Sequence, residues 1–162
     1  MSKLVVRHEV SGANEHGNPA FGRPNAALLA VGRENARKMG SVFIPKYGID
    51  PAFTPAATSD FLRAKETAAR AGFVRRSEYS LLNEVEHGTN LVELRHMLRV
   101  ERKTPAAALL QAELLLEQAP DEQIWFTHGL VILGLYGVLG LERGSNERYV
   151  PNFGEIIELP ID

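Results

Sequence analysis

Two kinds of hydrophobic pattern alternate along the chain. Residues 3–6 and 124–127 are short apolar runs that stop at polar or ionisable side chains. Such runs are typical of strands that are covered on both faces of a sheet. Residues 25–48 instead repeat apolar side chains every three or four positions, which predicts a helix. Residues 59–72 consist of good helix formers that end at Gly72, which predicts a second helix. A leucine-rich helix is predicted between Thr104 and Pro120. Further strands are predicted within residues 53–58, 73–82 and 154–160, the last on a sheet edge.

The alternation of strands and helices predicts an α/β sandwich with a mostly parallel central sheet. The 162 residues fit a single domain, 1–162. Ser59 is the expected N-cap of the second helix. Ligand crevices in such sheets lie at the carboxyl ends of the strands. The polar side chains that follow residues 3–6 and 124–127 are therefore expected to meet at one crevice.

Composition and charge exclude several classes of function. A hydrophobic fraction of 44% and a charged fraction of 23% are ordinary for a globular protein. The net charge of −2 shows no basic surface for nucleic acid. The absence of cysteine excludes disulfides and thiolate chemistry. No signal peptide and no apolar stretch of about 20 residues is visible, so we expect a cytoplasmic protein that binds no membrane.

Several polar groups converge on the expected crevice. Arg7 and His8 follow the first strand, and His128 follows the strand at 124–127. Ser59 and Arg63 come from the start of the second predicted helix. Two arginines, two histidines and a helix start predict a site for a tetrahedral dianion such as a phosphoryl group. Guanidinium groups suit this task because they bind phosphate oxygens two at a time.

Four motifs carry a family resemblance. They are R-H at residues 7–8, S-D-F-L-R-A-K-E-T-A at 59–68, L-N-E-V-E-H-G at 82–88 and T-H-G at 127–129. In this order they resemble the histidine phosphatase superfamily, whose fold is phosphoglycerate mutase-like. The resemblance implies a three-layer α/β/α sandwich. It also implies a histidine acid phosphatase-type phosphoric monoester hydrolase that needs no metal ion or other cofactor.

The resemblance assigns catalytic roles to five residues. His8 matches the nucleophile that becomes a phosphohistidine, and covalent catalysis of this kind divides one difficult displacement into two easier ones. Arg7, Arg63 and His128 match residues that bind the phosphoryl oxygens. Glu84 matches the acid that protonates the leaving oxygen and then activates water. Glu86 is a rival for this acid role.

Other residues are candidates for substrate binding. Asn14 stands where the family often has an asparagine near the phosphate, and Ser59 begins the second motif. Residues 88–103 are expected to form a short lid, in which Arg95 and Arg99 either bind acidic groups of the substrate or form part of a solvated charged surface. The implied partner is a phosphorylated small molecule or a phosphoprotein.

Glu9 departs from the family pattern, which usually continues R-H-G and often R-H-G-E. Either Glu9 replaces the glycine and Asn14 stays in register, or one residue is deleted, so that Glu9 matches the family's glutamate and Asn14 lies one position closer. Glycine there permits a positive φ or a close backbone approach. A carboxylate would repel a dianion unless it points away or meets a cation. Three functions therefore remain open: an active phosphatase, which the other motifs favour; a phosphoglycerate mutase-like phosphotransferase, for which the lid is short; and a catalytically impaired phosphate-binding or regulatory domain. The pattern determines neither the substrate nor the oligomeric state.

Overall fold

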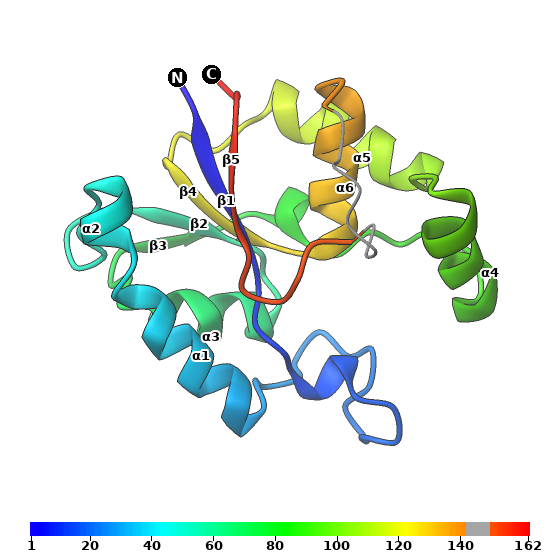
Figure 1. Ribbon diagram of the computed structural model, residues 1–162, viewed down its shortest axis with the longest axis horizontal. Helices are drawn as coiled ribbons and strands as arrows, with labels where there is room; N and C mark the ends of the chain where they lie inside the picture. The colour runs from blue at the N-terminus through cyan, green and yellow to red at the C-terminus, as the bar shows by residue number, and fades with distance from the viewer. Residues whose placement is uncertain (142–149) are drawn as a thin grey trace.

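The computed structural model describes residues 1–141 and 150–162 (Figure 1). In this part of the chain one five-stranded sheet has the order β3-β2-β4-β1-β5. The first four strands are parallel to their neighbours, and β5 runs antiparallel to β1 at the edge. The strands are β1 (Lys3–Arg7), β2 (Ala56–Thr58), β3 (Arg76–Glu78), β4 (Ile124–Thr127) and β5 (Ile156–Leu159).

Helices cover both faces of the sheet (Figure 1). α1 and α3 lie on one face, and α5 and α6, which pack against each other, lie on the other. The helices are α1 (Ala30–Gly40), α2 (Phe43–Tyr47), α3 (Leu62–Arg70), α4 (Leu91–His96), α5 (Ala106–Glu117) and α6 (Gly129–Val138), with a π-helical turn at Met97–Glu101. Short 3-10 turns occupy Gly12–Asn14 and Ser80–Leu82. The prediction of a three-layer α/β/α sandwich with a mostly parallel sheet is confirmed.

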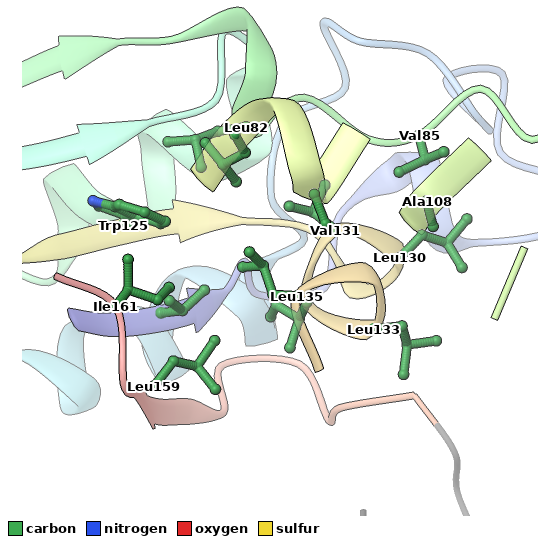
Figure 2. Packing of buried hydrophobic residues seen from close by; sticks show 14 of the residues in the cluster. Leu82, Val85, Ala108, Trp125, Leu130, Val131, Leu133, Leu135, Leu159 and Ile161 are labelled. Carbon is green, nitrogen blue, oxygen red and sulfur yellow. The ribbon is translucent and has the colours of Figure 1, made fainter. Parts of the chain in front are cut away.

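Alternation along the central strands divides the core into two parts. Val5 and Trp125 face α5 and α6, whereas Leu4, Val6 and Phe126 face the α1 and α3 side. This follows from the strand period of two residues, which sends successive side chains to opposite faces. Figure 2 shows part of the cluster that includes α6. Burial on both faces explains why β1 and β4 read as uninterrupted apolar runs.

The first predicted helix is shorter than expected and is divided in two. The prediction placed one helix over residues 25–48, but α1 begins at Ala30, and α2 starts only at Phe43. Residues 25–29 are not helical: the Ala26 N–H donates to the Arg23 carbonyl at 3.3 Å, and Leu28 forms an isolated bridge with Ser11. Gly48 ends α2 with a left-handed φ of 66°, as a helix-terminating glycine does.

The predicted N-cap of the second helix is wrong. α3 begins at Leu62, three positions after Ser59, and its N-cap is Phe61. The Ser59 hydroxyl still accepts the Phe61 N–H at 3.1 Å, but it is also bound by groups outside the helix. No helix in residues 1–141 or 150–162 is both long and apolar enough to cross a bilayer.

Candidate active site

His8 lies directly beyond β1 and is 1% exposed. Its Nδ1 is 2.6 Å from the carbonyl oxygen of Glu9, and the Arg63 Nε–H donates to its Nε2 at 3.2 Å. An arginine only donates and a carbonyl only accepts, so the proton of His8 is on Nδ1. The lone pair of Nε2 is therefore presented on the side of Arg63.

His8 is held as a neutral imidazole. Burial, followed by the charges of Arg63 and Arg7, keeps its pKa well below the ordinary value, although the Glu9 carbonyl acts in the opposite direction. A neutral imidazole retains the lone pair that a nucleophile requires.

Arg63 is brought to His8 by the first turn of α3. Its side chain is 5% exposed, and its Nη1 donates to the carbonyl of Arg23 at 3.3 Å. Thr67, one turn later, donates to the Arg63 carbonyl at 2.7 Å and accepts the Glu9 N–H at 3.0 Å. The Arg and Thr of the second motif thus fix α3 against the segment that carries His8.

Arg7 is the last residue of β1 and lies beneath the segment 150–154. Its guanidinium donates to the Pro151 carbonyl, and its Cζ lies 4.0 Å from the ring centroid of Phe153. Gly129 packs closely on the other side, because an added Cβ there would lie 3.3 Å from Arg7 Nε and 2.7 Å from Val150 Cγ1. The glycine of T-H-G therefore makes room for the arginine.

His128 follows β4 and is fully buried beside His8, with ring centroids 4.9 Å apart. Its Nε2 is 2.9 Å from Ser59 Oγ. Its Nδ1 has no hydrogen-bond partner among the described residues. Burial, then the neighbouring His8 ring and the charges of Arg63 and Arg7, keep the pKa of His128 well below its ordinary value.

The structure distinguishes the two candidate acids. The Glu84 carboxylate accepts the Val85 N–H at 3.0 Å and the Leu130 N–H at the start of α6. Burial raises the pKa of this carboxyl, and those two hydrogen bonds and the charges of Arg7 and Arg63 only partly oppose the rise. Glu86 is exposed. Glu84, not Glu86, thus shares the electrostatic environment of the arginines.

Asn14 lies in the turn that follows β1. Its Oδ1 accepts the N–H of Ser11 at 3.1 Å and the Ser11 hydroxyl at 2.8 Å. Its Nδ2 has no hydrogen bond within the described residues, so a donor remains for a ligand.

The predicted lid is helical and carries both candidate arginines on its exposed surface. Arg95 lies on α4 and contacts Nε2 of His16, in the loop after Asn14. Arg99 lies on the following π-helical turn and makes no hydrogen bond or ion pair to any described residue. The structure therefore connects Arg95, but not Arg99, to the loop that follows β1.

Glu9 adopts a conformation that does not require glycine. Among the described residues, Arg102 is the one non-glycine residue with a positive φ. The Glu9 carboxyl accepts the Val10 N–H at 3.3 Å and a hydrogen bond from Asn35 of α1. It also lies against Gly154, where an added Cβ would be 2.1 Å from Glu9 Oε1. Burial raises the pKa of this carboxyl.

Sequence reasoning missed Phe153, Pro151 and Asn83. Phe153 packs its ring 5.8 Å from that of His8. Asn83 bonds Ser59 and the Asp60 backbone, although its position inside L-N-E-V-E-H-G could have marked it. No comparable signal marked residues 150–154, because their place depends on β5 pairing with β1.

The described residues include no cluster of three or more His, Asp or Glu side chains placed to hold a metal ion.

Solved structures share this fold. TTHB049 from Thermus thermophilus has a TM-score of 0.68 and 23% identity over 99% of this chain and 94% of that chain. Rv3214 from Mycobacterium tuberculosis has a TM-score of 0.68 and 18% identity over 97% of this chain and 89% of that chain. A protein named mycobacterial hydrolase 1 has a TM-score of 0.62 and 14% identity over 97% and 90%.

The sequence itself carries the family assignment. No curated protein shows a significant match to the chain. The family model described as histidine phosphatase superfamily (branch 1), however, matches residues 4–109, which is more than half of the chain. The chain therefore belongs to the histidine phosphatase superfamily, whose membership supports a phosphatase or phosphotransferase activity.

Proposed function

We propose that the protein hydrolyses a phosphomonoester through a phosphohistidine on His8, without a metal ion. The observation that carries this proposal is the state of His8. Its Nδ1–H is held by the Glu9 carbonyl, and its Nε2 accepts the Nε–H of Arg63 with 3.2 Å between the two nitrogens. A nucleophilic nitrogen is thus paired with a group that attracts a phosphoryl oxygen.

The reaction consists of two balanced displacements. In the first, Nε2 of His8 bonds to phosphorus, the P–O bond to the leaving group breaks, and the carboxylic proton of Glu84 passes to the leaving oxygen. In the second, water attacks the phosphohistidine and gives a proton to the Glu84 carboxylate. The P–N bond breaks, and inorganic phosphate and neutral His8 are restored.

The elevated pKa of Glu84 suits this cycle. Burial favours the protonated carboxyl that the first displacement consumes. The charges of Arg7 and Arg63 act on Glu84, so in the proposed reaction the acid and both arginines act on the same phosphoryl group. Their positive charge stabilises the negative charge of the equatorial oxygens in each transition state.

The position of Glu9 supports an active enzyme over an impaired one. Its carboxyl is bound by the Val10 N–H and Asn35, and its pKa is raised by burial. A carboxyl that is held in this way and shifted toward its neutral form repels an incoming dianion less than an exposed carboxylate does.

The test is hydrolysis of an aryl phosphate in the presence of a chelator, with the wild type, His8→Ala and a His96→Ala control. His96 is exposed on α4 and contacts Glu101, so its loss leaves the site intact. We expect turnover and an acid-labile phosphoenzyme in the wild type and the control, and neither in His8→Ala. Turnover that survives His8→Ala would falsify the phosphohistidine mechanism.

The same samples distinguish hydrolysis from phosphotransfer. With a substrate that carries a second hydroxyl, hydrolysis releases inorganic phosphate, whereas a phosphotransferase returns an isomer that keeps its phosphoryl group. Tight binding of phosphate by the wild type without any turnover would instead indicate a binding domain.

A further inference from the structure

The Asn83 side chain begins a hydrogen-bond chain that ends at His128. Asn83 Oδ1 accepts the backbone N–H of Asp60 at 2.8 Å, and its Nδ2 donates to Asp60 Oδ2 at 3.0 Å. A backbone N–H can only donate and a carboxylate can only accept, so both contacts give the same orientation of the amide. The oxygen of Asn83 therefore faces Ser59.

This orientation fixes the direction of the next hydrogen bond. Ser59 Oγ lies 2.8 Å from Asn83 Oδ1, which has no proton to give, so the Ser59 hydroxyl donates to Asn83. A hydroxyl has one proton, so Ser59 accepts at its remaining contacts. One is the Phe61 N–H at 3.1 Å, and the other is Nε2 of His128 at 2.9 Å.

His128 is consequently protonated on Nε2. A neutral imidazole carries one proton, so Nδ1 is bare, and this atom is buried without a partner among the described residues. The charged or titratable groups that act on His128 are Arg7 and His8 at the end of β1 and Arg63 on α3. Burial and these groups keep the pKa of His128 low, so the ring is neutral before a ligand binds.

We propose that Asn83 is a positioning residue which, through Ser59, holds the proton of His128 on Nε2, so that an oxyanion bound at His8 requires one additional proton at His128 Nδ1. Nε2 is already used by Ser59, so Nδ1 is the atom with which His128 contacts the oxyanion. A bare nitrogen repels an anionic oxygen, whereas a proton between them forms a charge-assisted hydrogen bond. This inference rests on the proposed function only in taking the ligand to be a phosphoryl-like oxyanion.

The proton has two sources. When the ligand is a dianion, His128 takes the proton from solvent and becomes an imidazolium. A protonated phosphate monoanion brings the proton itself, and its P–O–H donates to Nδ1. Sulfate separates the two cases, because it carries no proton near neutral pH and any uptake must then occur on the protein.

The first experiment is ¹⁵N NMR of the histidine side chains in the ligand-free protein, with His128 assigned by comparison with His128→Gln. We expect the signals of a neutral ring with its proton on Nε2. Ser59→Ala and Asn83→Ala are expected to populate the Nδ1–H form, and Ser59→Thr, which keeps the hydroxyl, is expected to retain the wild-type signals. A wild-type proton on Nδ1 overturns the proposal.

The second experiment counts protons by titrating inorganic sulfate into the protein in two buffers of different ionisation enthalpy. We expect the wild type and Ser59→Thr to take up about one proton per bound sulfate, so that the affinity falls about tenfold per pH unit. In Ser59→Ala and Asn83→Ala the uptake is expected to fall. Binding without uptake in the wild type, or unchanged uptake in both variants, contradicts the proposal.

Neither experiment requires turnover. If no phosphohistidine forms but the tautomer and the uptake are as expected, the proposed function fails and the role of Asn83 stands. If hydrolysis occurs through a phosphohistidine but the proton of His128 is on Nδ1, the proposed function stands and the role of Asn83 fails. If Asn83→Ala does not fold, the tautomer of His128 and the proton uptake in the wild type and in the two Ser59 variants still test the proposal.

Discussion

Replacement of Glu84 by Gln tests the acid of the proposed reaction with almost no change of shape. The substitution removes the proton that the first displacement gives to the leaving oxygen. It also exchanges one of two acceptor oxygens for an NH₂ group, while the N–H groups of Val85 and Leu130 still require acceptors. The effects on chemistry and on folding can therefore be considered separately.

The two effects differ widely in size. Loss of a positioned general acid lowers kcat by about 10² to 10⁴-fold, which corresponds to roughly 3 to 5 kcal/mol at about 1.4 kcal/mol per tenfold change. Loss of one hydrogen bond to a buried N–H costs about 1–3 kcal/mol of folding stability, within the 5–15 kcal/mol that is typical of a domain. The variant should remain folded and be slow.

The assay compares an alkyl phosphate, whose leaving oxygen needs a proton, with an activated aryl phosphate, which leaves as an anion. Glu84→Gln should lose most activity toward the alkyl substrate and less toward the aryl one. Glu86→Gln is the matched control, because Glu86 is two positions away and exposed. The wild type should lose alkyl phosphatase activity as pH rises through the elevated pKa of Glu84, and the variant should lack this alkaline limb.

Equal losses for both substrates would show that Glu84 acts by binding and not as an acid. A large loss in Glu86→Gln with little change in Glu84→Gln would transfer the role to Glu86 and refute the reasoning from burial.

Three further predictions address Arg63, Gly129 and Glu9. Arg63→Lys keeps the charge but loses the Nε–H that reaches His8, so kcat/KM should fall by about 10² to 10³-fold; steady-state kinetics would show an unchanged value if charge alone mattered. Gly129→Ala adds a Cβ near Val150 and Arg7, so thermal unfolding should report a loss of about 1–3 kcal/mol and kinetics a higher KM. The Glu9 pKa is raised in the folded protein, so Glu9 contributes most to stability below its unfolded pKa, and this contribution is lost as pH rises through the folded pKa. Glu9→Gln should therefore be nearly neutral at about pH 4 and should gain stability relative to the wild type toward about pH 7; a difference that does not change with pH in melting curves would contradict this sign.

Local patterns in the sequence predicted the central strands well. An uninterrupted apolar run of this length indicates a strand covered on both faces or a short buried helix segment. In the structure Leu4, Val5 and Val6 are buried on alternating faces of the sheet. The polar residues that end β1 and β4 meet because these strands are parallel neighbours in register.

The contacts that complete the site were beyond local reasoning. Ser59 resembles an N-cap in any local window, and its hydroxyl instead binds His128, 69 positions away. The prediction of one long helix over residues 25–48 was wrong for a similar reason. The chain just before this segment is held by long-range hydrogen bonds, such as the one that the Leu62 N–H donates to the Pro24 carbonyl. Such hydrogen bonds become visible only when the fold is known.

The crossing of residues 150–154 over the end of β1 has a consequence for protein synthesis. Arg7 binds the Pro151 carbonyl, 144 positions later, and the Gly154 N–H closes on the Arg7 carbonyl at 2.9 Å. His8 and Arg7, the proposed nucleophile and one of the arginines proposed to bind phosphate, therefore leave the ribosome long before the segment that encloses them. Long-range contacts of this kind form late in folding. A nascent chain that already contains every motif residue up to His128 should consequently be inactive, and activity should appear only after β5 has emerged and paired with β1.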